Sequence, residues 1–251
     1  LDHNGVEKMG YIPKSALPKL YNFAKLGAIH EYINDGSPVT AEVCFGSEAK
    51  SLLIGTAGRG GSSIYALDVT NLSNPSASNI LWDFSNKDDS DLGLTIGQPS
   101  ITKNGSGNPL VILSSGYNNT SGKGYLYILN ARNTGSWIQN SNYWKIPLGS
   151  SGVGEPFVYD DNRDGIPEAV FVGDNEGKVW RINYDQASNT WSNPYGTSPL
   201  YSPSSSNSPI TGAPFAQKVG GRLYVVVGTG QYFSLSDIAS NVQNYALGLF
   251  A

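Results

Sequence analysis

The chain has almost no cysteine and almost no histidine. Cys44 is its single cysteine, so no disulfide can form within these 251 residues. The thiol either pairs with a segment outside this chain or is buried, and its place between Val43 and Phe45 in an apolar strand end favours burial. The two histidines, His3 and His30, form no metal pair and no combination of base and nucleophile, so histidine-based catalysis is not expected.

Charge and long apolar segments are also scarce. Charged residues make up 14% of the chain, the net charge is −4, and no run of Lys and Arg occurs, which gives no support to nucleic-acid binding. Apolar segments such as 223–227 have the length of a strand, so no transmembrane segment is predicted. No signal peptide opens the sequence and its first residues look like the middle of a protein, so we expect a fragment of a larger one.

Glycine, with 30 residues, and tyrosine, with 15, are abundant, which is typical of strands joined by tight turns. A Gly-x-Pro motif recurs at similar intervals, beginning at Gly36, Gly97, Gly154 and Gly212. Each motif is followed by an apolar run that ends in a small residue, at 52–55, 111–114, 169–173 and 225–228. Two unrelated patterns with the same period indicate an internal repeat.

Each repeat holds about four strand-like segments separated by Gly-rich turns, which is the layout of a propeller blade. The third segments are 64–68, 126–130 and 179–183, and a fourth, Trp-bearing segment follows at 81–84 and 143–146. We therefore predict an all-β fold, a modified β-propeller of four-stranded blades forming a single domain over residues 1–251. About four units are visible, starting near residues 36, 97, 154 and 212, as part of a larger propeller.

Other segments carry weaker predictions. Residues 1–35 form a leading segment, in which apolar residues at helical spacing predict a short helix between Pro13 and Leu26 that lies on the blades. Residues 201–208 are rich in Ser and Pro and predict a mobile loop. Four tryptophans are expected in the core between blades: Trp82, Trp144, Trp180 and Trp191.

The clearest local motif is residues 160–168, which carry an oxygen-bearing side chain at every second position around an acidic turn. Calcium takes roughly six to eight oxygen ligands, and loops with ligands at alternate positions supply most of them. Three carboxylates this close together would repel one another without a cation. The predicted calcium ligands are the side chains of Asp160, Asn162, Asp164 and Glu168 and the main-chain carbonyl of Ile166.

This loop is not an EF-hand, because Phe171 stands at its twelfth position and strand-like residues flank it. A solvated acidic turn without metal remains the alternative interpretation.

Several segments together resemble the C-terminal domain of the PilC/PilY family, the type IV pilus tip-associated adhesins and biogenesis factors. The resemblance covers nearly the whole chain and rests on residues 10–20, 30–38, 58–70, 91–93, 97–99, 115–118, the calcium loop with 173–181, and 228–232. Where the family commonly has Asp, this chain has Asn162 and Glu168, and it contains no Arg-Gly-Asp tripeptide.

The resemblance implies a modified propeller that is exported to the bacterial cell surface, outer membrane or pilus tip. It implies pilus components such as minor pilins as partners, together with host-cell or abiotic surfaces. The implied roles are pilus biogenesis, extension against retraction, twitching and adhesion, with Ca²⁺ as the bound ion. Because the predicted ligands lie in one loop and the two histidines form no catalytic set, we expect no enzymatic activity.

Two other classes of propeller stay open as alternatives. Quinone-dependent dehydrogenases also use calcium, but they bring ligands to the axis from several blades, whereas all the ligands predicted here lie in one loop. A structural or ligand-binding propeller similar to the integrin alpha head shares the calcium chemistry and differs in its partner.

Overall fold

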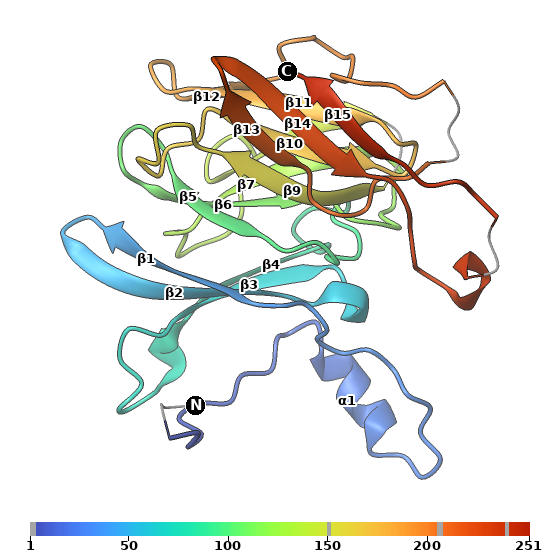
Figure 1. The fold of residues 1–251 in the computed structure, drawn as a ribbon. Helices are drawn as coiled ribbons and strands as arrows, with labels where there is room; N and C mark the ends of the chain where they lie inside the picture. Colours follow the sequence, from blue (N-terminus) through green and yellow to red (C-terminus); the bar gives the residue numbers. More distant parts are fainter. Residues whose placement is uncertain (1–3, 150–151, 205–207, 239–240) are drawn as a thin grey trace.

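The computed structural model describes residues 4–149, 152–204, 208–238 and 241–251. Over these ranges the chain folds into four antiparallel sheets, three of four strands and one of three, in which consecutive strands are neighbours. Figure 1 shows the sheets stacked in sequence order, from the blue first sheet to the red last one. The predicted all-β organisation in four units is confirmed.

The first sheet contains β1 (Val39–Phe45), β2 (Glu48–Thr56), β3 (Ser63–Asp68) and β4 (Ile80–Ser85). The second contains β5 (Ser100–Lys103), β6 (Pro109–Ser114), β7 (Gly124–Asn130) and β8 (Tyr143–Gly149). The third contains β9 (Val153–Tyr159), β10 (Ala169–Asp174), β11 (Val179–Asp185) and β12 (Thr190–Ser192). The fourth contains β13 (Phe215–Val219), β14 (Arg222–Gly228) and β15 (Ala246–Phe250). Short 3-10 helices occupy Gly58–Gly60, Ala77–Asn79 and Leu235–Asp237.

The first strands of successive sheets face one another: β1 contacts β5, β5 contacts β9, and β9 contacts β13. The second strands β6 and β10 are buried along their whole length, because neighbouring sheets cover both of their faces. This is the arrangement of propeller blades, and it explains the unbroken apolar runs in the sequence.

The core lies between the sheets, in three apolar clusters. The cluster between the first and second sheets is rich in aromatic residues, with the ring centroids of Phe84 and Tyr127 5.6 Å apart. The other two clusters centre on β10, with Val170 and Val172 facing the second sheet and Phe171 facing the fourth. Each such apolar side chain contributes about 1.5–3 kcal/mol to the stability of the fold when it is fully buried.

Two of the Gly-x-Pro glycines, Gly97 and Gly154, lie against the backbone of the next unit. A Cβ atom at Gly97 would lie 3.0 Å from the Cα of Glu155, the middle residue of the next motif. A Cβ atom at Gly154 would lie 2.8 Å from the carbonyl oxygen of Thr211, while Gly212 has open space around it. The backbone of the next unit therefore requires glycine at the second and third motifs.

The four tryptophans lie between sheets, but to different depths. Trp82 and Trp180 are buried, as predicted. Trp144 and Trp191 are only partly buried and pack against the edge of the cluster between the second and third sheets.

The predicted burial of Cys44 is wrong, because this side chain is exposed. Successive residues of a strand point to opposite faces, and in β1 it is Val43 and Phe45 that pack against the core. Apolar neighbours on both sides in the sequence therefore place Cys44 on the solvent face.

The helix α1 (Leu17–Phe23) lies within the predicted range but is shorter, and none of its residues is buried. Figure 1 shows it projecting beyond the first sheet, so it does not lie on the blades as expected. The leading segment is held before, within and after the helix. The Tyr11 hydroxyl donates a hydrogen bond of 2.9 Å to Asp83 Oδ1, Lys19 Nζ donates to the Gly60 carbonyl at 2.8 Å, and the Asp35 amide donates to the Ala57 carbonyl at 3.0 Å.

In the predicted mobile loop at 201–208, residues 205–207 lie outside the described residues. Tyr201 forms an antiparallel bridge with Val179, so the start of this loop is tied to the third sheet.

Candidate functional site

The predicted calcium loop joins β9 to β10 in the third sheet. Tyr159 and Ala169 pair at its base, and the backbone amide of Glu168 donates to the carbonyl of Tyr159 at 2.9 Å. Arg163 and Gly165 have positive φ values of 60° and 84°, which allow the tight turn. The loop is therefore a closed hairpin connection within one sheet.

The side-chain oxygens of the first three predicted ligands converge on the backbone of the turn. Asp160 Oδ1 and Asn162 Oδ1 both accept from the Asp164 amide, at 3.2 and 2.9 Å. Asp160 Oδ2 accepts from the Gly165 amide at 2.8 Å. Asp164 Oδ1 accepts from the Ile166 amide at 2.7 Å. One turn thus gathers oxygens from residues at three alternate positions.

The other two predicted ligands lie at the end of the loop. Glu168 Oε2 accepts a hydrogen bond of 2.6 Å from the Asp161 amide, which ties the two ends of the loop together. Within the described ranges, no hydrogen bond reaches the carbonyl of Ile166. Nor do three or more His, Cys, Asp or Glu side chains there form a group arranged to hold a metal.

The donor types nevertheless suit a hard cation, because Asp160, Asn162 and Asp164 bring side-chain oxygens to one turn and, among the described residues, no hydrogen bond reaches the Ile166 carbonyl. Glu168 would have to leave the Asp161 amide to complete the set.

The loop also reaches the second sheet. The Gly165 carbonyl accepts from the Lys103 amide at 3.1 Å and from the Thr102 hydroxyl at 2.8 Å, both in β5. Asp160 and Gly165 line a pocket of about 900 Å³ bounded mainly by β1 and β5. The loop at 160–168 therefore lies at the junction of neighbouring blades.

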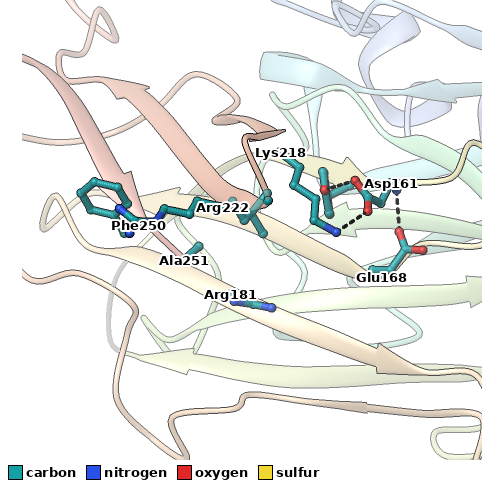
Figure 2. A pocket seen from close by; sticks show the side chains of 10 residues that line it. Asp161, Glu168, Arg181, Lys218, Arg222, Phe250 and Ala251 are labelled. Carbon is teal, nitrogen blue, oxygen red and sulfur yellow. Dashed lines mark hydrogen bonds and ion pairs between the residues drawn. The ribbon is translucent and has the colours of Figure 1, made fainter.

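On its opposite side the loop reaches the fourth sheet through Asp161 (Figure 2). The Asp161 carboxylate accepts hydrogen bonds from the Tyr159 hydroxyl and, at 3.0 Å, from Lys218 Nζ in β13. The Tyr159 hydrogen bond and Lys218 lower the pKa of Asp161, while burial and Asp161 together raise the pKa of Tyr159 to about 12.

Sequence reasoning missed Asp161, although its signal was present. It alternates with the predicted ligands, so its side chain leaves the turn in another direction. Asp161, Glu168, Arg181, Lys218 and Arg222 line a pocket of about 690 Å³ between the third and fourth sheets, as Figure 2 shows.

The model of the PilY1 beta-propeller domain family matches residues 13–251. The chain belongs to this family. The predicted resemblance to PilC/PilY proteins is thus confirmed over almost the whole sequence.

Two curated relatives are similar at 30% identity. The type IV pilus biogenesis factor PilY1 of Pseudomonas aeruginosa strain UCBPP-PA14 aligns over 262 residues, which cover 93% of this chain and 22% of that protein. A PilY1 homolog of Xylella fastidiosa strain Temecula1 aligns over 255 residues, which cover 94% of this chain and 17% of that protein. The chain therefore spans less than a quarter of the length of these PilY1 relatives.

A solved structure confirms the PilY1 propeller fold. The crystal structure of the Pseudomonas aeruginosa PilY1 C-terminal domain matches with a TM-score of 0.81 and 26% identity, over all of this chain and 54% of that one. No helix in the described part of the chain is long and apolar enough to cross a membrane.

Proposed function

We propose that this chain is a calcium-binding propeller domain of a type IV pilus-associated surface protein that supports pilus biogenesis and extension, twitching and adhesion. The observation that carries the calcium proposal is the convergence of side-chain oxygens from Asp160, Asn162 and Asp164 on one turn. The pilus role is supported by the relatives, which are named type IV pilus biogenesis factors.

Calcium would supply positive charge among the carboxylates of Asp160, Asp164 and Glu168, which otherwise repel one another. Residues of the loop connect the proposed ion site to the two neighbouring sheets. The Gly165 carbonyl holds the loop to β5, and Asp161 holds it to Lys218 in β13. A rigid loop would therefore fix the third sheet against both of its neighbours.

We infer that the domain is not an enzyme. A quinone-dependent dehydrogenase needs ligands from several blades around the axis, whereas the predicted ligands here belong to one hairpin loop. An ion held in one loop is suited to bracing a structure.

In this proposal the domain acts at the bacterial cell surface, outer membrane or pilus tip. Its partners there are pilus components such as minor pilins, and it meets host-cell or abiotic surfaces.

The test places Asp164→Ala in the full-length protein and measures surface pili and twitching. We expect both to fall at unchanged protein level. Asp185→Ala is the matched control, because Asp185 likewise caps the amide two residues ahead, at 3.0 Å, but lies outside the loop. Normal twitching in the Asp164→Ala strain would contradict the proposal.

A further inference from the structure

A third pocket opens at the outer rim of the molecule, between the second and third sheets. It has a volume of about 270 Å³. Its lining combines two tryptophans, three asparagines, a threonine, a lysine and two aliphatic side chains: Asn104, Leu110, Asn140, Trp144, Lys145, Ile146, Asn189, Thr190 and Trp191. Trp144 comes from β8 and Trp191 from β12, so each wall belongs to a different sheet.

The two tryptophans of this rim pocket differ from the other three in the chain. The indole N–H groups of Trp82 and Trp137 donate to main-chain carbonyls at 2.8 and 2.7 Å, and that of Trp180 donates to Asp174 at 2.8 Å. No acceptor for the indole N–H of Trp144 or Trp191 is found in the part of the chain that the structure describes. Both pocket tryptophans therefore keep a free donor and a partly exposed ring.

The outer edge between the first and second sheets provides an internal comparison. Trp82 pairs with Ala66 in β3, and Trp144 pairs with Ile128, the equivalent residue of β7. Trp82 is covered by Trp137, whose ring lies edge-on with centroids 5.2 Å apart. Between the second and third sheets the ring of Trp144 stays accessible. Neighbouring blades can therefore pack without leaving such a pocket, as the first two sheets do.

Asparagine amides surround the pocket. Asn140 and Asn189 have positive φ values of 64° and 54°, a conformation that asparagine tolerates. Asn104 Oδ1 accepts from the amides of Ser106 and Asn108 at 3.0 and 2.9 Å. Among the described residues, the amide NH₂ groups of Asn104 and Asn189 and the whole side chain of Asn140 have no partner.

The walls are also held together before any ligand arrives. The Tyr184 hydroxyl donates to Asn189 Oδ1 at 2.7 Å and accepts from the Gly105 amide at 2.9 Å, joining turns of the two sheets. The rings of Tyr184 and Trp191 pack with centroids 4.7 Å apart. Such preorganisation lowers the cost of binding.

We propose that this rim pocket binds a neutral sugar ring at the end of a glycan. The flat C–H faces of a pyranose pack on the electron-rich faces of indole rings. Its hydroxyl groups accept hydrogen bonds from amide NH₂ and indole N–H donors. The volume lies just below the range of drug-sized sites, which suits one small ring.

The charge around the pocket favours a neutral sugar over an acidic one. Among the described residues, Lys145 is the one cationic side chain in its lining, and Lys145 Nζ is already paired with Asp89 at 2.9 Å and Asp91 at 2.7 Å. A carboxylate on the ligand would meet no free cation. The inference gives the adhesion part of the proposed function a ligand class, and it does not depend on calcium.

The experiment titrates the purified chain, in buffer with EGTA, with methyl glycosides of glucose, galactose, mannose and N-acetylglucosamine. Indole N–H signals are followed by ¹⁵N NMR. We expect at least one glycoside to shift the signals of Trp144 and Trp191 while those of Trp82, Trp137 and Trp180 stay fixed.

Asn140→Gly removes one free amide while keeping the positive φ, and we expect it to weaken binding about tenfold. Asn118→Gly is the matched control, since Asn118 is exposed, has φ of 59° and lies outside the pocket. Trp191→Phe, which keeps an aromatic ring but removes the indole donor, is expected to weaken binding as well.

The absence of any shift with all four glycosides would overturn the inference. So would equal binding by wild type and Asn140→Gly, or tighter binding of methyl glucuronide than of methyl glucoside. None of these results bears on calcium binding by the loop, so failure here is distinguishable from failure of the calcium proposal.

Discussion

At the residue scale, Gly154 sets how closely the third and fourth units approach. Gly154→Ala is expected to lower the free energy of unfolding by about 1–3 kcal/mol, because the new methyl group would lie 2.8 Å from the Thr211 carbonyl. Gly212→Ala, in the same motif but with open space, should change it by less than about 0.5 kcal/mol. Urea denaturation measures both, and equal losses would contradict the packing explanation.

Asp174 gives a second residue-scale prediction, on pH. Its carboxylate is buried and accepts from Trp180 Nε1 and the amides of Glu176 and Lys178, yet burial raises its pKa above 3.8. The stability that protonated Asp174 contributes to the fold is therefore fully present below the pKa of Asp174 in the unfolded chain. It is lost as pH rises through the higher pKa of Asp174 in the folded protein.

The Asn side chain of Asp174→Asn cannot titrate, and its NH₂ group would face the N–H donors that the carboxylate accepts from. Donor would then meet donor, so the variant should be less stable than wild type. The gap between the two proteins, measured by denaturation across this pH window, should narrow as pH rises. A difference in stability between wild type and Asp174→Asn that grows as pH rises would contradict a raised pKa of Asp174.

At the element scale, the connection from β4 to β5 is held by Lys145 of β8. Lys145 Nζ contacts Asp89 and Asp91 at 2.9 and 2.7 Å, and the Tyr143 hydroxyl donates to Asp89 at 3.0 Å. Asp89 is only 8% exposed, so removing the cation leaves a buried charge without its partner.

Lys145→Met is therefore expected to lower stability by about 3–5 kcal/mol, measured by chemical denaturation. Lys87→Met, at an exposed lysine of the same connection, should have little effect. A loss of stability in Lys145→Met that is no larger than in Lys87→Met would contradict the role of Lys145 in holding the connection from β4 to β5.

The strands could be predicted from the sequence because their signals are local. Runs such as 111–114 and 169–173 are apolar and repeat with one period, and both form fully buried strands. Cys44 was misassigned because the side of a strand depends on the neighbouring sheet. The helix was overextended because apolar spacing does not guarantee a surface to pack against.

The calcium ligands could likewise be proposed from spacing alone, whereas their surroundings could not. The contacts of Asp161 with Lys218 and of Gly165 with Thr102 join residues far apart in the sequence. The same holds for Trp144 and Trp191, which come together only once two sheets are stacked.

At the scale of the whole molecule, the loop at 160–168 joins three sheets, so the calcium ion proposed for it should stabilise the fold. Calcium at about 100 times its Kd would add about 2.7 kcal/mol of stability. For a chain of 251 residues this raises Tm by about 5–10 °C relative to EGTA. Scanning calorimetry tests this, and a Tm unmoved by EGTA would contradict the bracing role.

The most direct test is isothermal titration calorimetry with calcium on wild type, Asp164→Ala and Asp185→Ala. Wild type and Asp185→Ala should each bind one calcium ion with the same affinity. Asp164→Ala should bind at least about tenfold more weakly, because the loop loses one of its converging carboxylates. Calcium binding by Asp164→Ala as tight as by wild type, or no binding by wild type, would contradict the assignment of the loop at 160–168.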